Sequence, residues 1–352
     1  MQSLIQQWSG ECVITTFDHD TGTWIFVAIH DTTLGPAMGG CRMKPYPTPT
    51  DGLRDAMRLA EGMTYKWAAI GFDLGGGKSV LAVPAPMDGG VRRGLLRRFG
   101  RLVASLRGAY ALGPDLGTTP EDMAVIGDVT EHVHGYDRRT GAAVDPGPFT
   151  ALGTYVGIRA ALAHAFGSPD LGGRTVLIEG VGDVGAPLAR MCAEAGATLV
   201  LSDVRGERAE RLAREIGVRT VPADEVYTTP CDVYAPCAVG ATLNERSVPL
   251  LACRIVAGCA NNQLAEPADA DRLHDRGILY APDYVINAGG ATALPLLGRG
   301  WSVDEVRARI QGFEGTLREI FEQAGQEHES PYHAAQRMVE HVLRARREEL
   351  GN

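Results

Sequence analysis

Two lysines with unusual neighbours could take part in catalysis. Lys66 lies near the end of an expected helix, between Tyr65 and Trp67. Lys78 follows three consecutive glycines twelve residues later, and glycines let the backbone approach a ligand closely. If both amines share one pocket, each lowers the pKa of the other and burial adds to this shift, so that one of them becomes a base near neutral pH. A lysine that merely ends a turn explains the local pattern of Lys78 equally well.

The segment around Lys78 does not fit a nucleotide phosphate loop. That motif requires a glycine five residues before Gly77, where this chain has Phe72. It also requires a helix after the lysine, whereas residues 79–83 have the pattern of a strand. We therefore exclude an NTPase of this type.

A glycine-rich segment in the second half of the chain predicts a dinucleotide site. The segment Gly180-Val-Gly182-Asp-Val-Gly185 follows an expected strand at 175–179 and opens an expected helix that runs to Ala195. In this context the glycines let backbone amides and the positive helix N-terminus approach a pyrophosphate. The alternative is a tight turn that binds no ligand.

Asp203 indicates which dinucleotide would bind. It ends the next expected strand, at the distance from the glycines that the dinucleotide fingerprint requires. Its carboxylate can accept hydrogen bonds from ribose hydroxyls and would repel a 2′-phosphate, which favours NAD over NADP. Arg205 weakens that preference slightly, and Asp183 places a negative charge inside the loop, where it would disfavour a pyrophosphate.

The elements that would position Lys66 and Lys78 lie before a boundary near Pro148. Expected in order are a hairpin with strands at 12–17 and 24–29, a helix from Asp51 to about Lys66, a turn at Gly75–Gly77, a strand at 79–83 and a basic helix at 91–107. The segment Thr118-Thr-Pro-Glu121 predicts a further helix start, with a threonine cap, proline in the first turn and Glu121 reaching back to the cap.

The chain beyond Pro148 predicts an α/β domain with a doubly wound parallel sheet. Expected are a helix at 150–166, strands at 175–179, 198–202, 218–222, 232–235, 254–258 and 278–281, and helices between the first of them, such as 206–216. Two amphipathic helices close the chain, one that carries Val303 to Ile320 and one after Pro331.

Length and composition limit the function classes. The chain has 352 residues, enough for about two domains of typical size. A net charge of −9 has the wrong sign for binding nucleic-acid phosphates, and no apolar run is long enough for a membrane span. Seven scattered cysteines without a Cys-x-x-Cys pattern predict reduced thiols and no metal site. We expect a cytoplasmic protein whose partners include neither nucleic acid nor membrane.

Several blocks of the sequence, in order and over nearly the whole chain, resemble the Glu/Leu/Phe/Val dehydrogenase family. The similarity is strongest to the leucine, valine and phenylalanine dehydrogenases. The blocks are Asp31-Thr-Thr-Leu-Gly-Pro-Ala-Met-Gly-Gly-Cys-Arg42, Gly62-Met-Thr-Tyr-Lys66, Leu74-Gly-Gly-Gly-Lys78, Asp115-Leu-Gly-Thr-Thr119, Tyr234-Ala-Pro-Cys237, Ala260-Asn-Asn-Gln263 and Ala281-Pro-Asp-Tyr-Val-Ile-Asn-Ala-Gly-Gly290.

The resemblance implies an NAD-dependent oxidoreductase that reversibly deaminates an apolar L-amino acid to its 2-oxo acid and ammonia. It implies a substrate, catalytic and oligomerisation domain at 1–148, on which a helix at 330–352 packs, and an NAD-binding Rossmann domain at 149–329. A cleft between the two domains closes for hydride transfer. A homo-oligomer is expected.

The resemblance also implies roles for individual residues. Lys78 and Asp115 run the proton chemistry, and Lys66 holds the substrate carboxylate. Other implied substrate contacts are Met38, Gly39, Gly40, Met63, Asn262, Ala291 and Leu294. Implied cofactor contacts are Thr150, Gly180, Gly182, Asp183, Val184, Gly185, Asp203, Cys237, Ala238, Asn261 and Asn287.

Some positions depart from the family pattern. Pro114 replaces an acidic residue, Trp67 stands where asparagine is common, and Asp145-Pro-Gly-Pro148 replaces an Asn-Pro-Ser-Pro hinge. Met38, Ala291 and Leu294 leave the side-chain pocket apolar without identifying one amino acid. Two alternatives stay open at this point: the same chemistry on a specialised amino acid such as tryptophan, and a relative that binds NAD or an amino acid without catalysis.

Overall fold

The computed structural model describes residues 2–137 and 140–351, and the chain forms two compact units. The first unit is built from three stretches of the chain, and the second from two. The first contains the chain up to Asp145, Leu294–Gly300 and the residues from Val339 onward, and the second contains Pro146–Ala293 and Trp301–Met338.

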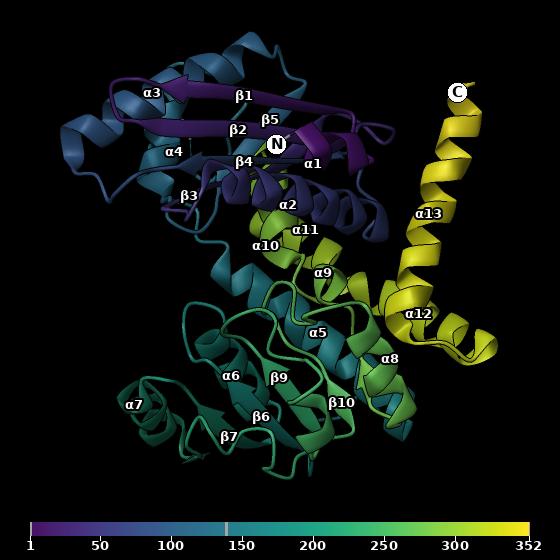
Figure 1. Ribbon diagram of the computed structural model, residues 1–352. Helices are drawn as coiled ribbons and strands as arrows, with labels where there is room; N and C mark the ends of the chain where they lie inside the picture. Colours follow the sequence, from purple (N-terminus) through teal and green to yellow (C-terminus); the bar gives the residue numbers. More distant parts are fainter. Residues whose placement is uncertain (1, 138–139, 352) are drawn as a thin grey trace. The chain divides into compact units, whose positions relative to one another are not determined.

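The first unit is built on a five-stranded sheet. Its strands are β1 (Cys12–Asp18), β2 (Thr23–Asp31), β3 (Ala37–Lys44), β4 (Gly75–Ala82) and β5 (Tyr110–Pro114), in the order β1-β2-β4-β3-β5. The predicted hairpin is confirmed, since β1 and β2 pair antiparallel from Cys12 opposite Ile29 to Asp18 opposite Thr23. Strand β3 runs parallel to both β4 and β5, so the ends of these three strands meet at one edge (Figure 1).

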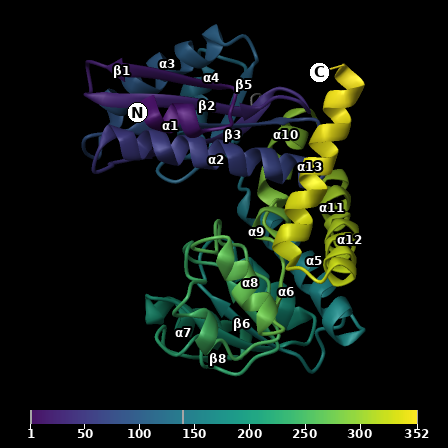
Figure 2. The same cartoon turned by 45° about the vertical axis from the view of Figure 1, so that its right-hand side comes forward.

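Helices cover both faces of this sheet (Figures 1 and 2). They are α1 (Gln2–Gln7), α2 (Pro49–Ala69), α3 (Gly89–Ser105) and α4 (Pro120–Gly127). On one face, Leu53 and Ala60 of α2 pack with Phe26 and Val80 of the sheet. On the other, Leu96 and Phe99 of α3 belong to a separate core cluster with Val27 and Leu112. Burial of these apolar faces fixes the sheet between the helices.

The start of α4 differs in detail from the prediction. Thr119 is the cap and Pro120 the first helical residue, as expected. The residue that reaches back to the cap is Asp122, however, and not Glu121. With Thr119 as the cap, Asp122 takes the third helical position, from which a carboxylate reaches the cap amide. Helix α2 has the same capping arrangement, with Thr48 and Asp51.

The prediction of a turn at Gly75–Gly77 is wrong, because these glycines form the first half of β4. A Cβ at Gly76 would lie 2.0 Å from Oγ1 of Thr64 and 2.4 Å from the carbonyl oxygen of Ala60, both in α2. A Cβ at Gly77 would lie 2.8 Å from the Tyr110 ring. The glycines therefore leave room for helix α2 and for the Tyr110 ring beside β4, a tertiary requirement that outweighs their turn propensity.

The second unit contains the predicted parallel sheet. Its strands are β6 (Thr175–Glu179), β7 (Thr198–Ser202), β8 (Arg219–Thr220), β9 (Val233–Pro236), β10 (Ile255–Val256) and β11 (Leu279–Tyr280), in the order β11-β10-β9-β6-β7-β8. All pairs are parallel, and the order reverses direction at β6, as in doubly wound folds. Helices α5 (Gly147–Phe166), α6 (Gly185–Glu194), α7 (Gly206–Ile216) and α8 (Ala268–Asp275) and the short 3-10 helix Val248–Leu250 accompany the strands.

The end of the chain is more divided than predicted. Two helices that the sequence did not predict, α9 (Asp283–Ile286) and α10 (Gly289–Gly298), follow β11. The single helix expected from Val303 to Ile320 is two, α11 (Val303–Gln311) and α12 (Phe313–Glu327). They separate at Gly312, whose amide bonds to Arg309 three residues back, and glycine has a low helix propensity. The last helix, α13 (Pro331–Leu350), agrees with the prediction.

Within the described part of the chain, no helix has both the length and the apolar character that a membrane crossing requires.

Candidate active site

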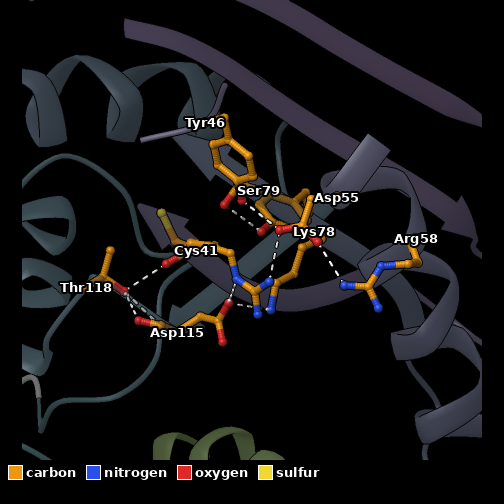
Figure 3. A network of polar contacts seen from close by, with 10 residues as sticks. Cys41, Tyr46, Asp55, Arg58, Lys78, Ser79, Asp115 and Thr118 are labelled. Atoms are coloured by element: carbon orange, nitrogen blue, oxygen red, sulfur yellow. Dashed lines mark hydrogen bonds and ion pairs between the residues drawn. The ribbon is translucent and has the colours of Figure 1, made fainter. Parts of the chain in front are cut away.

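Lys78 and Asp115 form an ion pair in the first unit. Nζ of Lys78, on β4, lies 3.1 Å from Oδ2 of Asp115, which directly follows β5 (Figure 3). The side chains are 7% and 19% exposed, so the pair is largely shielded from water. Strand β3 lies between them, and Gly40 supplies the necessary space. A Cβ at Gly40 would lie 2.7 Å from Cβ of Asp115 and 2.9 Å from the Lys78 amine.

Arg42 is a second cation on the same carboxylate, and the sequence analysis assigned it no role. Its Nε donates to Oδ2 of Asp115 over 2.8 Å, and its Nη1 donates to Oδ2 of Asp55 over 2.9 Å. Asp55 also accepts hydrogen bonds from Tyr46 at 2.6 Å and Arg58 at 2.9 Å. One signal could have indicated Arg42. Side chains alternate along a strand, so Arg42 lies on the same face of β3 as Gly40, which is next to Lys78 and Asp115.

These contacts determine the charge of Asp115. Burial raises its pKa, but the charges of Lys78 and Arg42 and their hydrogen bonds outweigh burial and hold the pKa well below its usual range. The pKa of Asp55 is also lowered, because Tyr46, Arg58 and Arg42 together outweigh its burial. Both groups are therefore carboxylates at neutral pH.

The loop after β5 is fixed on β3, which sets the position of Asp115. The Thr118 hydroxyl donates to the carbonyl oxygen of Cys41 at 2.8 Å and accepts from the Asp115 amide at 2.9 Å. Gly117 has a φ of +84°, and a Cβ there would lie 1.7 Å from the carbonyl oxygen of Met43. Arg92 donates to the Gly117 carbonyl at 2.7 Å. The carboxylate is thus presented by a backbone with little freedom to move.

Several predicted substrate residues lie on β3, between the two members of this pair, or against β5. Met38 and Gly39 precede Gly40 on β3, and a Cβ at Gly39 would lie 3.2 Å from Cγ of Met63. Leu294 is 8% exposed, and its Cδ1 lies 3.2 Å from the position of a Cβ at Gly113, the register partner of Gly40. Apolar side chains therefore surround the strands that carry the ion pair.

Trp67 connects the end of α2 to this region. Its indole nitrogen donates to the carbonyl oxygen of Met38 over 3.0 Å, and the side chain is buried. Lys66 is the neighbouring residue, in the last turn of the same helix. The helix end that carries Lys66 is thus fastened to the strand that carries Met38.

The glycine loop of the second unit has the shape of a dinucleotide cradle. Gly180 has a φ of +93°, and a Cβ there would lie 2.8 Å from the Ala238 side chain. A Cβ at Gly185, where α6 begins, would lie 1.9 Å from the Gly180 carbonyl oxygen. In contrast, no atom of the described chain lies within 4 Å of a Cβ position at Gly182, so the loop is open on that side. Val184 is the cap of α6, and Asp183 is exposed. The glycine backbone and the N-terminus of α6 fit a pyrophosphate.

Asp203 is tied to this loop. Its Oδ2 accepts from the Val181 amide at 3.0 Å and its Oδ1 from the Arg205 amide at 2.9 Å. Each carboxylate oxygen has a further lone pair, so the contacts leave acceptor capacity for ribose hydroxyls.

Other predicted cofactor residues gather near the carboxyl ends of the same sheet. The Cys237 amide bonds to the Glu179 carbonyl at 2.7 Å, which places Cys237 and Ala238 beside the glycine loop. The Asn287 amide group donates to Oδ1 of Asn261 at 2.7 Å. The Thr150 hydroxyl accepts from the Gly290 amide at 3.1 Å.

Asn262 and Ala291 belong to the second unit, whereas Lys66 and Leu294 belong to the first. The Asn262 backbone has a φ of +52°, and its carbonyl accepts from the Ala241 amide at 2.7 Å. Substrate contacts of Asn262 and Ala291 stay a prediction.

In residues 2–137 and 140–351, no three His, Cys, Asp or Glu side chains are grouped as a metal ion would require.

A parallel sheet with a glycine cradle, together with a shielded lysine–aspartate pair, defines a dinucleotide-binding oxidoreductase. Comparison with known proteins specifies the class. The family model described as "Glu/Leu/Phe/Val dehydrogenase, dimerisation domain" matches residues 13–132, and that described as "Glutamate/Leucine/Phenylalanine/Valine dehydrogenase" matches residues 204–349. The chain belongs to the Glu/Leu/Phe/Val dehydrogenase family and is an amino-acid dehydrogenase.

Individual relatives match over almost their full length. Leucine dehydrogenase of Bacillus subtilis is 39% identical, over 99% of this chain and 96% of that protein. Valine dehydrogenase of Streptomyces virginiae is 40% identical, over 94% of this chain and 92% of that protein. The crystal structure of L-tryptophan dehydrogenase from Nostoc punctiforme superposes with a TM-score of 0.85 at 36% identity, covering 99% of this chain and 100% of that one.

Proposed function

We propose that this dehydrogenase catalyses the reversible oxidative deamination of an apolar L-amino acid to its 2-oxo acid and ammonia, with NAD as the cofactor. The observation that carries the proposal is the shielded contact of 3.1 Å between Lys78 and Asp115, two groups that can exchange protons within one turnover. The similarity to leucine and valine dehydrogenases supports the apolar substrate.

The amino acid would bind with its carboxylate at Lys66 and the backbone near Gly39 and Gly40. Bound NAD supplies the oxidant that accepts a hydride from Cα, which converts the amine to an iminium. Lys78, once in its neutral amine form, takes a proton from a water molecule as the water oxygen bonds to the iminium carbon. Asp115 accepts the proton of the resulting hydroxyl group and delivers it to the nitrogen, so that the C–N bond breaks, ammonia leaves and the carbonyl forms. The reverse sequence aminates the 2-oxo acid.

The residues of the second unit would hold the cofactor. Amides at Gly182 and Gly185 suit the pyrophosphate, whereas Gly180, whose amide bonds to the Ser202 carbonyl, shapes the turn, and Asp203 suits the adenosine ribose. A 2′-phosphate at that ribose would face the Asp203 carboxylate, which supports NAD over NADP. The other predicted contacts would surround the remainder of the dinucleotide.

An apolar side chain fits the residues near the ion pair. A second substrate carboxylate would need a cation or hydroxyl, because an unpaired buried charge is costly. Met38, Met63 and Leu294 offer none, nor does Ala291. The similarity to a tryptophan dehydrogenase makes tryptophan a substrate to include in any test.

The test measures NADH absorbance after mixing the chain with NADH, ammonium and one 2-oxo acid at a time. The panel contains the oxo acids of leucine, valine, phenylalanine, tryptophan and glutamate. We expect consumption of NADH with the branched-chain or aromatic acids. No consumption with any of them, or 2-oxoglutarate as the best substrate, contradicts the proposal.

We also propose a homo-oligomer in the cytoplasm. The family description "dimerisation domain" for residues 13–132 supports self-association. Light scattering coupled to size-exclusion chromatography would measure the subunit number, and a mass equal to one chain would contradict the proposal.

A further inference from the structure

The two oxygens of the Asp115 carboxylate have different surroundings. Lys78 and Arg42 both contact Oδ2, at 3.1 and 2.8 Å. Among the residues that the structure describes, no hydrogen bond or ion pair to Oδ1 is found. Figure 3 shows this asymmetry: dashed contacts reach one oxygen of Asp115 and not the other.

Arg42 is itself fixed from its far side. Its guanidinium group bonds to Asp115 through Nε and to Asp55 through Nη1. Asp55 is held in turn by two further donors. The Tyr46 hydroxyl bonds to Oδ2, the oxygen that Arg42 contacts, and Arg58 bonds to Oδ1. A guanidinium is planar and rigid, so two carboxylates bound at different nitrogens fix both its position and its plane. At 14% exposure for both Arg42 and Asp55, this bracing is largely screened from solvent.

We propose that Arg42 is a positioning residue that holds Oδ2 of Asp115, so that Oδ1 is the oxygen that exchanges the proton with the reacting nitrogen. The inference rests on the proposed function, since it assigns an atom to the proton transfer described there. Arg42 itself touches neither the substrate nor the cofactor in this assignment.

The chemistry explains why such a residue is useful. A carboxylate that accepts and returns one proton could take it on either oxygen. A proton on Oδ2 would have to displace a hydrogen bond from Lys78 or Arg42, whereas a proton on Oδ1 displaces neither. The proton therefore stays on the side open to substrate, and the carboxylate begins and ends each turnover ionised.

The charge of Arg42 also lowers the pKa of Asp115, together with the effects of the other ionisable groups around it. The ionisable groups around Asp115 and Arg42 come from β3, the segment after β3, α2, β4 and β5. They are Cys41, Arg42, Tyr46, Asp55, Lys78 and Tyr110. Burial raises the pKa of Cys41 to about 12 and raises that of Tyr110, so both stay neutral. Loss of Arg42 would leave Lys78 as the cation in contact with Asp115.

The test compares Arg42→Gln and Arg42→Lys with Arg54→Gln as a matched control. Arg54 lies on the same helix as Asp55, but its side chain is 56% exposed and it pairs with Asp51, outside the network around Asp115. Activity is measured as kcat, KM for the amino acid, and the pH dependence of kcat. NADH binding by fluorescence and thermal unfolding confirm that each variant is folded.

For Arg42→Gln we expect kcat to fall on the order of ten- to a hundredfold, the value of a hydrogen bond to a charged group, with a much smaller change in KM. The acidic limb of the pH profile should move to higher pH, because a carboxylate that loses a cation protonates more readily. Arg42→Lys keeps the positive charge, so the acidic limb of the pH profile should stay where it is in the wild type and part of kcat should be recovered. Arg54→Gln should match the wild type in kcat and in the pH profile.

A purely structural role for Arg42 would lower stability without moving the acidic limb, and that result overturns the inference. If Arg42→Gln does not fold, Asp55→Ala takes its place, since it removes the carboxylate that braces Arg42 but keeps the Arg42 charge. It should lower kcat and leave the limb in place, and an unchanged kcat overturns the inference. Lys78→Ala separates the two proposals: normal turnover in that variant contradicts the proposed function, whereas its inactivity beside a normal Arg42→Gln contradicts only the present inference.

Discussion

The indole nitrogen of Trp67 donates to the carbonyl oxygen of Met38 over 3.0 Å, and both side chains are buried. This bond joins the helix end that carries Lys66 to the strand that carries Gly39 and Gly40. These are the groups proposed to hold the substrate carboxylate. The bond thus fixes the spacing between two parts of one binding site.

Replacing Trp67 with phenylalanine should therefore weaken substrate binding more than it slows turnover. A smaller aromatic ring replaces the buried indole, which costs some packing, and one hydrogen bond worth about 1 kcal/mol is lost, so KM for the amino acid should rise roughly fivefold. Steady-state kinetics measure the effect. Trp24→Phe is the control, because Trp24 stacks on Phe26 on the α2 face of the sheet. Equal KM values in both variants would show that the Trp67 bond does not set the binding geometry.

Lys78→Ala and Asp115→Asn should each reduce kcat by roughly two or more decades, the usual contribution of general acid–base catalysis. The dinucleotide cradle belongs to the second unit, so NADH binding should persist in both variants. Arg97→Ala is a suitable control, since Arg97 pairs with Asp128 on the exposed surface of the first unit. Near-normal turnover in either site variant contradicts the assigned roles.

Leu294→Ala should change substrate preference. Leu294 lies over Gly113, and each methylene of space is worth about 0.8 kcal/mol, or roughly fourfold in kcat/KM. We expect the ratio of kcat/KM for phenylalanine to that for valine to rise by at least about fourfold. Leu296→Ala, in the same helix and also buried, should cost about 2–5 kcal/mol of stability without changing this ratio. A ratio that moves equally in both variants places the pocket elsewhere.

Asp203→Ser should raise KM for NAD and lower it for NADP, which narrows the cofactor preference. Two effects contribute, because Asp203 carries charge and also accepts from the Val181 amide of the glycine loop. Asp203→Asn separates them, since an asparagine can keep the amide contact without the charge. Both variants are assayed with each cofactor. A wild-type enzyme that already prefers NADP would contradict the role of Asp203.

Glu179→Gln should stabilise the chain more at about pH 7 than at about pH 4. Burial raises the pKa of Glu179, the Tyr234 hydrogen bond opposes this, and the Asp203 charge adds to it. A carboxyl whose pKa is higher when folded than when unfolded contributes stability below its unfolded pKa and loses it as pH rises through the folded one. Glutamine stays neutral and can still accept from Tyr234. Urea unfolding at the two pH values measures the difference, and an equal effect at both would refute the linkage.

The sequence predicts elements whose signal is local. The hairpin at 12–29, the strands at 175–179 and 198–202 and the helix at 206–216 agree with the structure to within a few residues, because alternation and helical periodicity are properties of the segment itself. The turn wrongly expected at Gly75–Gly77 and the undivided helix from Val303 to Ile320 fail for the opposite reason. There the outcome depends on a packed neighbour or on a single glycine.

The residues of the candidate site divide in the same way, into those with a signal in the sequence and those that only the folded sheet brings together. Lys78 and Asp115 stand in glycine-flanked blocks that resemble the family, and the resemblance implied their roles; the local pattern of Lys78 alone left a turn lysine equally possible. Arg42 lies 73 residues from Asp115 and 13 from Asp55; alternation places it on the same face of β3 as Gly40, but the sequence does not show that these carboxylates lie at that face. The register of β3 against β4 and β5 brings them together, and that register becomes known only with the sheet.

The first unit is completed by the last helix of the chain. Arg347 of α13 donates to Asp31 and Thr33, at the end of β2 and just beyond it, while the whole second sheet lies between these segments in the sequence. During translation, Asp31 is synthesised early and Arg347 late. The sheet that carries Lys78 and Asp115 therefore gains this contact only after the second unit has been synthesised. A chain shortened before α13 should leave this end of the sheet exposed to chaperones and proteases.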